Sequence, residues 1–593
     1  MFFLTSFYSL LIFSSIMFYG FIFNKIFNFK VSNHTHYFIL GSLAIIFFSL
    51  AVNFFLPLNI FITSTIFYFT SVLGLIFIIF KLKKFKELTF IIIFTTLITY
   101  KSSPYDDYYL YQLPYIEILK NFKIVFGLSN IEWRFGHTSI IQNISAFLSN
   151  GLMKNDSYIF FAPLLVSIVL LEIYNIFLTS KNKLTIVLCS IFISFYLIHA
   201  NRYGALGNDY PSHALAFLSF IFFLNIFSKD NKEKINFLFY LLISVIIICF
   251  FSKLSFIFLF ILIFFVLFKK YKFIKINKSF IIFSVILLSF FFVKNIINSS
   301  CFIFPIYSTC IDSKWSPNEY SEYSSKYVAA LSKVAAKDYQ NSGLFNTNAN
   351  FKKNFIKENF DIYKNLNSEE KHVLDLIAHY SWYNQIQIWL PAYLKNHFKQ
   401  KILKELLLHL LVILIFNYVF FIYFKNKFIK FSYKKLFSFE IISLFSLNLI
   451  FIIFWFLNFP LLRYGISFLL ILISIPVYLQ INYFEVDIKK IKKYYLYFFA
   501  ILMIYSLVYS VNRYIFFNET TNTTANIVPL IIYPSTSKNI NGVKFSIANS
   551  VCGLNESPCI YSGNWKNFSN EFHVDLFKNY LFITNKKYSL MNN

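Results

Sequence analysis

Apolar segments of about 20 residues, separated by short lysine-rich connections, recur along this chain from its first residues to about residue 516. Each is long enough to cross the ~30 Å hydrocarbon core of a bilayer as a helix, in which the backbone polar groups are hydrogen-bonded internally. The sequence is 58% hydrophobic and 14% charged, whereas a soluble domain carries about 25% charged residues. The pattern predicts an all-α polytopic membrane protein.

We expect about fourteen transmembrane helices within a membrane domain of residues 1–516. The predicted spans are 3–23, 37–56, 59–80, 88–100, 157–178, 184–200, 211–228, 235–251, 254–268, 279–299, 405–424, 436–457, 462–482 and 494–516. Lysine clusters occupy alternate connections, at 81–86, 181–183, 229–234, 269–278, 425–435 and 489–493. The positive-inside rule makes these connections cytoplasmic. The large loops 100–150 and 300–404 and both termini are then external, and the net charge of +27 does not indicate a nucleic-acid partner.

Residues 517–593 follow the last predicted span and contain short apolar runs separated by polar residues. We expect a small external α/β or β appendage. Two cysteine pairs at short separation lie in external segments, Cys301 with Cys310 and Cys552 with Cys559. Such pairs suit disulfides in an oxidising compartment, with free thiols as the alternative.

Loop 100–150 carries the most concentrated set of polar residues, and it begins with the adjacent carboxylates Asp106 and Asp107. Two neighbouring carboxylates raise each other's pKa, so one of them could act as a general base or orient an acceptor hydroxyl. The alternative is a helix N-cap, because residues 108–122 have the apolar spacing of a short amphipathic helix on the membrane surface. The two readings are compatible.

Arginine is rare, since only four of the 54 basic residues are arginines. They are Arg134, Arg202, Arg463 and Arg513. Where lysine supplies most positive charge, the remaining arginines are candidates for sites that need a planar, two-point donor to phosphate. Ordinary anchoring at the membrane interface is the alternative.

Three further residues complete the candidate set. Asp209, in a short external loop, could be a second acid or could belong to a turn that starts the next helix. Lys253 lies in a tight external hairpin, where a cation near membrane depth either contacts a partner or reaches back to the interface. His137 lies in the same polar connection as Arg134. Glu172 and Lys294 lie inside predicted spans, near the cytoplasmic and the external end respectively. We therefore do not expect an ion pair between them.

Short motifs in the membrane domain resemble the polytopic glycosyltransferases of the GT-C type, and more closely an uncharacterised group of bacterial multi-pass membrane proteins. The motifs are Tyr105-Asp106-Asp107, Gly127-Leu128-Ser129-Asn130, Arg134-Phe135-Gly136, Lys253-Leu254-Ser255, Asn295 through Phe304-Pro305-Ile306-Tyr307, and Pro460 with Arg463-Tyr464-Gly465. The resemblance implies a GT-C-like helical fold in the bacterial inner membrane. It also implies that Asp106 or Asp107 is the base and that Arg134, Lys253 or Arg463 contacts phosphate. One departure is that the acidic loop follows the fourth predicted span, whereas many GT-C enzymes have it after the first.

The expected function is transfer of a sugar, with inversion, from a polyprenyl phosphate or polyprenyl diphosphate carrier to an external glycan, lipid or protein acceptor. The alternatives are a polysaccharide polymerase or ligase, a transporter or flippase for lipid-linked glycans, and a purely structural membrane subunit. The charges gather at one face and the spans are apolar, which favours an interfacial enzyme over a path through the membrane. No cofactor is implied, and a divalent metal stays open. The expected partners are the lipid bilayer, the lipid-linked donor and the acceptor, and not nucleic acid.

Overall fold

The structure is a computed structural model. It describes residues 2–29, 31, 33–82, 85–99, 108–137, 139–153, 155–200, 207–228, 231–304, 306–315, 390–391, 393–423, 439–458, 460–483, 487–520, 535–548, 552, 558–561, 569, 572–577 and 580–585. The α-helices are α1 (Phe2–Phe27), α2 (His34–Phe55), α3 (Ile60–Phe77), α4 (Phe85–Thr99), α5 (Leu113–Asn121), α6 (Ile140–Phe147), α7 (Phe161–Thr179), α8 (Lys183–Ile198), α9 (Asp209–Phe227), α10 (Lys232–Ser252), α11 (Phe260–Lys270), α12 (Lys278–Ser299), α19 (Leu408–Tyr423), α20 (Phe439–Asn458), α21 (Leu462–Tyr483) and α22 (Ile488–Thr520). The strands are β1 (Ser535–Ile540), β2 (Val543–Ala548), β3 (Cys559–Tyr561), β4 (Phe572–Phe577) and β5 (Tyr580–Asn585).

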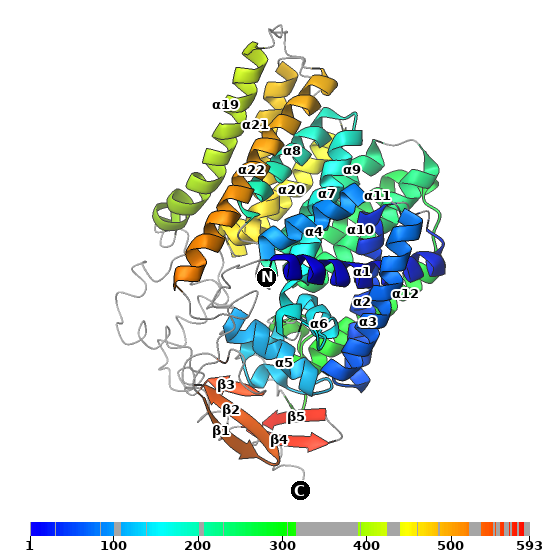
Figure 1. Cartoon of the computed structure of the whole chain (residues 1–593), viewed down its shortest axis with the longest axis vertical. Helices are drawn as coiled ribbons and strands as arrows, with labels where there is room; N and C mark the ends of the chain where they lie inside the picture. The colour runs from blue at the N-terminus through cyan, green and yellow to red at the C-terminus, as the bar shows by residue number, and fades with distance from the viewer. Residues whose placement is uncertain are drawn as a thin grey trace.

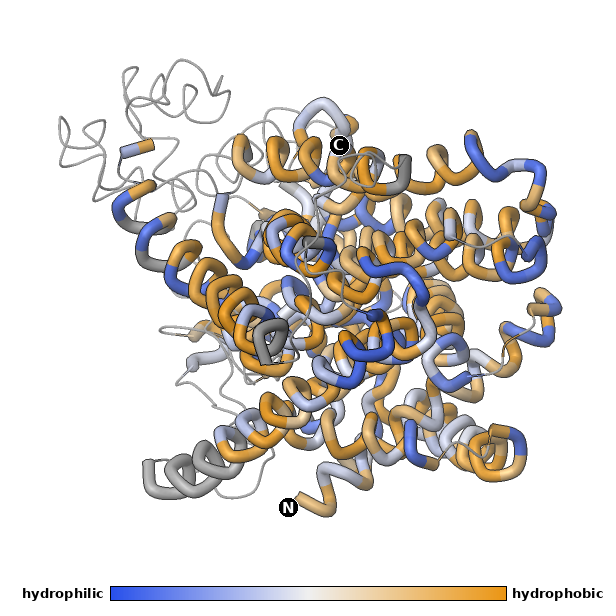
Figure 2. Tube along the Cα trace, turned by 90° about the horizontal axis from the view of Figure 1, so that it is seen from above, coloured by the Kyte–Doolittle hydropathy of each residue, from blue (hydrophilic) through white to orange (hydrophobic). Residues whose placement is uncertain are grey.

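Within the described residues, eleven helices are long and apolar enough to cross a membrane. The predicted mostly helical fold, with many apolar helices of membrane-spanning length, is confirmed, whereas the expected count of about fourteen spans stays a prediction. The other three predicted spans, 88–100, 184–200 and 436–457, correspond to α4, α8 and α20. Figure 2 shows apolar residues along most of the helices, with hydrophilic residues gathered at many of the turns and helix ends.

Two glycines bring the first two helices into backbone contact. A Cβ atom on Gly20 of α1 would lie 1.9 Å from the carbonyl oxygen of Tyr37, and one on Gly41 of α2 would lie 2.1 Å from that of Ile16. No larger residue fits at either position without moving a helix. Small residues that allow close backbone approach are typical of helix packing in membranes, where lipid is as apolar as the helix surface.

Asparagine begins several of the helices. The side-chain oxygens of Asn59, Asn182, Asn231 and Asn277 accept hydrogen bonds from backbone N–H groups in the first turns of α3, α8, α10 and α12. Each bond satisfies a donor that the helix itself leaves without a partner. The asparagines of the polar connections therefore fix where these helices start.

The short helices α5 and α6 lie at one end of the bundle, next to the strands (Figure 1). Residues 108–121 are helical, as expected, with a π-helical turn at Tyr108–Gln112 before α5. The position of this segment at the membrane surface stays a prediction, and Leu113, Tyr115 and Ile116 are all buried within the protein. The adjoining helix α6 and the segments around it cover its apolar side chains.

The described residues after 534 form two small sheets, β1-β2-β3 and β4-β5. Strand β5 is fixed to the polar connection that follows α5. The backbone N–H of Phe126 donates to the carbonyl oxygen of Leu581 at 2.9 Å, and that of Ile583 donates to the carbonyl oxygen of Phe126 at 3.0 Å. The rings of Phe126 and Phe582 stack with centroids 4.6 Å apart. The C-terminal region is thus docked on loop 100–150.

Disulfides join Cys301 to Cys310 and Cys552 to Cys559, the pairs that the sequence predicts. The first closes a short loop after α12 in which Phe304 packs against Gly136 of loop 100–150. We expected residues 300–404 to form a mostly helical cap over that loop. The described start, 300–315, contacts it but contains only a 3₁₀ turn at Tyr307–Thr309, while residues Leu394–Leu407 are π-helical. Residues 316–389 lie outside the described part of the chain.

Candidate functional site

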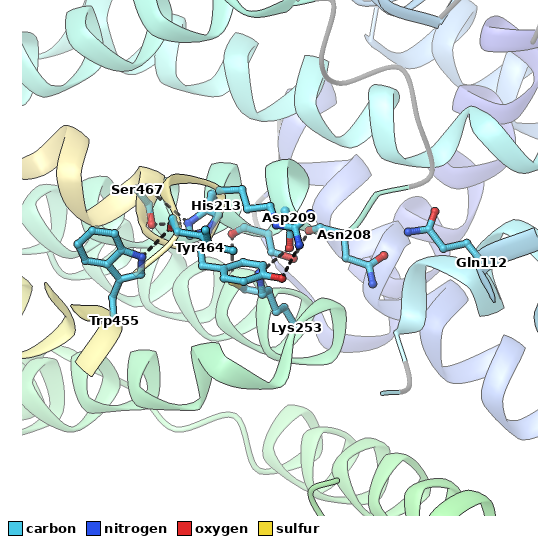
Figure 3. A network of polar contacts seen from close by, with 12 residues as sticks. Gln112, Asn208, Asp209, His213, Lys253, Trp455, Tyr464 and Ser467 are labelled. Atoms are coloured by element: carbon cyan, nitrogen blue, oxygen red, sulfur yellow. Dashed lines mark hydrogen bonds and ion pairs between the residues drawn. The ribbon is translucent and has the colours of Figure 1, made fainter. Parts of the chain in front are cut away.

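Asp209 lies between the cations Lys253 and Arg463, and Figure 3 shows Lys253 beside it. Asp209 is the first residue of α9, Lys253 follows the last residue of α10, and Arg463 is the second residue of α21. The Lys253 Nζ atom is 2.5 Å from Oδ1 of Asp209, and the Arg463 Nε atom is 3.8 Å from Oδ2. The lysine reaches this position because α10 ends there and the chain turns sharply into the 3₁₀ segment Leu254–Leu259. We call these three residues the Asp209 group.

The ring of Tyr464 lies against both cations of the Asp209 group. The Lys253 Nζ atom is 3.8 Å from the ring centroid and the Arg463 guanidinium carbon is 4.9 Å from it, both within range of a cation–π contact. Arg463 also donates a hydrogen bond to the Tyr464 hydroxyl at 2.9 Å. Its side chain is 50% exposed, against 20% for Lys253. The guanidinium of Arg463 is therefore the more accessible cation.

Two contacts hold the start of α21 in place. The indole N–H of Trp455 donates to the carbonyl oxygen of Leu461 at 2.8 Å. Gly465 lies so close to the indole that a Cβ atom there would be 2.6 Å from it. The Arg463-Tyr464-Gly465 motif thus needs glycine because the Trp455 ring occupies the space of a side chain.

His213 lies one helical turn after Asp209 and is fully buried. Its Nδ1 atom accepts a hydrogen bond from the backbone N–H of Ser467 at 3.4 Å and lies 2.9 Å from the hydroxyl oxygen of that residue. The proton of the neutral ring is then on Nε2, which has no hydrogen-bond partner within the described residues. Sequence reasoning missed His213, although its position four residues after Asp209 places both on one helix face.

Arg134 and His137 form a second part of the site, in and after the 3₁₀ turn Trp133–Gly136. The Nη1 atom of Arg134 is 3.0 Å from a carboxylate oxygen of Glu132. The ring of His137 makes an edge contact with Phe304, with centroids 5.2 Å apart.

Electrostatics connects this second part to the Asp209 group. The surrounding protein, and then the charges of Arg134 and Lys253, lower the pKa of His137 to about 4. All three causes act in one direction, so the imidazole is neutral at pH 7 although the residue keeps exposed surface. The pKa of Lys253 is itself lowered by burial, and the Asp209 carboxylate opposes that shift.

The structure therefore brings together Asp209, Lys253 and Arg463, and its electrostatics relates Lys253 to Arg134 and His137. Of the two alternatives predicted for Lys253, contact with a partner is the one observed, and the partner is Asp209. Three other predicted site residues, Asp106, Asp107 and Arg202, lie outside the described residues. In the described part of the chain no three His, Cys, Asp or Glu residues are grouped so as to hold a metal ion.

One contact connects this site to α6. Gln142 donates from Nε2 to the side-chain oxygen of Asn208, the residue before Asp209, at 3.4 Å. Gln112, at the end of the π-helical turn, lies on the side of Asn208 away from Asp209 (Figure 3). The helices of loop 100–150 thus flank the start of α9.

The described residues form a mostly helical protein with eleven helices long and apolar enough to cross a membrane, and with a charged group where three helix ends meet. Residues 1–361 match the family described as a domain of unknown function (DUF8201), and the chain belongs to that family. No curated protein and no solved structure matches the chain. The matched region includes Arg134, His137, Asp209 and Lys253, whereas Arg463 lies beyond it.

Proposed function

We propose that this protein is a membrane glycosyltransferase that moves a sugar from a polyprenyl phosphate or diphosphate carrier to an acceptor during cell-surface glycan assembly. The protein would lie in the bacterial inner membrane with its large loops outside. The observation that carries the proposal is the Asp209 group, in which two cations meet at helix ends that are partly exposed. A lipid-linked phosphate at the membrane boundary would meet cations at this position.

Charge supports a phosphate as the ligand. The cations Arg134, Lys253 and Arg463 outnumber the carboxylates Glu132 and Asp209 with which they pair. With His137 neutral, this set keeps a net positive charge. The half-exposed guanidinium of Arg463 offers the planar donor geometry that suits phosphate oxygens.

Asp209 is suited to orienting the cations rather than to taking a proton. Two ion pairs stabilise its charged form, and a carboxylate stabilised in this way is a weak base. The base in this proposal remains Asp106 or Asp107. Its carboxylate takes the proton of the acceptor hydroxyl while the acceptor oxygen bonds to the anomeric carbon. The bond from that carbon to the phosphate oxygen breaks, and the carrier phosphate leaves with the electron pair, stabilised by the cations.

A reconstituted assay tests the proposal. The purified full-length protein in liposomes is given polyprenyl phosphate sugars and polyprenyl diphosphate sugars, with cell-envelope glycan as acceptor, and loss of the lipid-linked sugar is measured. Lys253→Met should lower the rate at least about 30-fold, because removal of a partner from a desolvated charge pair costs 2 kcal/mol or more. The matched control is Lys275→Met, at an exposed residue outside the site. The proposal would be contradicted if none of the lipid-linked sugars were consumed, or if Lys253→Met consumed the donor as fast as the parent protein does.

A second candidate is a transporter of lipid-linked glycans, favoured by a charged group buried within the bundle. Glu172 of α7 is 5% exposed and lies 3.0 Å from the Nε2 atom of His36. Its carboxylate also accepts a hydrogen bond from Thr35. Ionisable residues inside membrane helices often mark a translocation path. Movement of a labelled lipid-linked glycan across the liposome bilayer without chemical change would favour this candidate over transfer.

A further inference from the structure

Lys294 is a buried cation near the end of α12. Its side chain is 2% exposed, and its Nζ atom donates to the side-chain oxygen of Asn143 at 2.5 Å. The same atom is 5.3 Å from the centroid of the Tyr115 ring. Within the described residues no carboxylate lies within 4.0 Å of it, unlike Lys253. An amide oxygen and a ring face compensate a buried ammonium group only in part.

Three more polar groups lie around Lys294, and one of them lacks a partner. The side-chain nitrogen of Asn143 is buried and makes no hydrogen bond within the described residues. Asn298 lies four residues after Lys294, on the same face of α12. Burial raises the pKa of Tyr115 and a side-chain hydrogen bond with the Asn298 amide lowers it, so these two groups contact each other. We call Tyr115, Asn143, Lys294 and Asn298 the Lys294 cluster.

The Lys294 cluster is rich in donors and poor in acceptors. The ammonium group and both amide nitrogens can only donate, and the phenol can donate too. Buried polar groups are nearly always paired, so a buried cation without a carboxylate, beside the unpaired amide nitrogen of Asn143, indicates a missing acceptor that is negatively charged. A phosphate group has several acceptor oxygens in a compact tetrahedron and satisfies such a set.

We propose that the Lys294 cluster is a binding site for a phosphate group, carried by a lipid or free in solution. The site is separate from the Asp209 group, because it shares no residue with it. The two are close in the fold, since Gln142, next to Asn143, bonds to Asn208, next to Asp209. The inference rests on the cluster alone and holds whether or not the protein transfers a sugar.

Binding requires a rearrangement at Asn143. In the structure its oxygen faces Lys294 and its nitrogen has no partner. When phosphate binds, the amide turns over, so that the nitrogen donates to the phosphate and the ammonium pairs with the anion instead. Asn143→Asp should mimic the bound state, because the new carboxylate is nearly the same size and supplies the missing charge.

The test is the thermal unfolding midpoint of the full-length protein in detergent. The probes are inorganic phosphate, pyrophosphate and a short-chain polyprenyl phosphate, with sodium chloride at matched ionic strength and a short-chain polyprenol, which has no phosphate, as the lipid control. We expect phosphate-containing probes to raise the midpoint of the parent. Lys294→Met should weaken the apparent affinity at least about 30-fold. Asn143→Asp should raise the midpoint without any probe and abolish the response.

Two control variants separate this site from others. Lys278→Met changes an exposed lysine at the opposite end of α12 and should respond as the parent does. Lys253→Met should also keep a response, because it alters only the Asp209 group. A response to polyprenyl phosphate alone would show that the site binds a phosphate carried by a lipid. A response to inorganic phosphate as well would show that it also binds phosphate free in solution. No response to any probe, or an equal response in Lys294→Met, would overturn the inference.

Discussion

Lys253 places its ammonium nitrogen 2.5 Å from a carboxylate oxygen of Asp209, although the two residues are 44 positions apart, one directly after α10 and the other at the start of α9. The contact joins the end of α10 to the start of α9, which pack along their length. Arg463 completes the arrangement from α21, near the other end of the chain. The carboxylate of Asp209 therefore links three helix ends, the start of α9, the end of α10 and the start of α21.

The first prediction concerns the stability that Asp209 contributes. Asp209→Asn keeps the size of the side chain but leaves Lys253 and Arg463 as neighbouring cations without a carboxylate between them. We expect the free energy of unfolding to fall by about 1–3 kcal/mol, between the values for exposed and fully buried pairs. Chemical unfolding in detergent micelles measures this change. Asp487→Asn, at an exposed residue, is the matched control, and an equal effect in both would show that the ion pair adds no stability.

The second prediction separates catalysis from carrier binding. If Asp106 or Asp107 is the base, replacing both by Asn should lower turnover by roughly 10²–10⁴-fold while the protein still folds. Arg134→Lys should instead raise the KM for the carrier, because a point charge does not reproduce a planar two-point contact. Lys253→Arg should have a milder effect. Unchanged turnover in the double Asn variant would indicate that Asp106 and Asp107 only cap a helix.

The third prediction is a pH dependence that comes from His137. Its pKa is about 4 in the folded protein, below the ordinary value near 6.5 that applies when the chain is unfolded. The unfolded state therefore binds a proton first as the pH falls. Stability from this residue is fully present above pH 6.5 and is lost between about pH 6.5 and 4.

Thermal unfolding from pH 8 to pH 4 measures this dependence, with His137→Gln as the comparison because it cannot titrate. The difference in midpoint between parent and variant should be constant above pH 6.5 and change below it. A difference that stays constant through pH 4 would show that the folded imidazole titrates like the unfolded one.

The fourth prediction is that both cysteine pairs are oxidised in the mature protein. Digestion without reduction, followed by mass spectrometry, should recover the Cys301–Cys310 and Cys552–Cys559 peptides as linked species. Replacing Cys301 and Cys310 by Ser should cost about 2–3 kcal/mol in the chain-entropy description. It should also loosen Phe304, which packs against Gly136 next to the site. Recovery of alkylated free thiols in unstressed protein would contradict the prediction.

The helices and most of their boundaries follow from the sequence by itself. Apolar runs of bilayer length predict helices because an unpaired backbone group in lipid is costly, and this holds whatever the helix packs against. The asparagines before α3, α8, α10 and α12 add local starting points. Three candidates marked from the sequence, Arg463, Lys253 and Asp209, lie together in the structure, and their role in a functional site stays a prediction.

Which residues meet was decided only by the tertiary structure. The 3.8 Å contact of Arg463 with Asp209, 254 positions earlier in the chain, requires α21 to pack beside α9, and no local pattern encodes that neighbour. The sequence analysis did not single out His213 and gave Lys294 no partner. Their importance comes from their neighbours in the fold, Ser467 for His213 and Asn143 for Lys294. Apolar surfaces attract without direction, so the order of helices depends on close fits such as Gly20 against Tyr37, which exist only once both helices are in place.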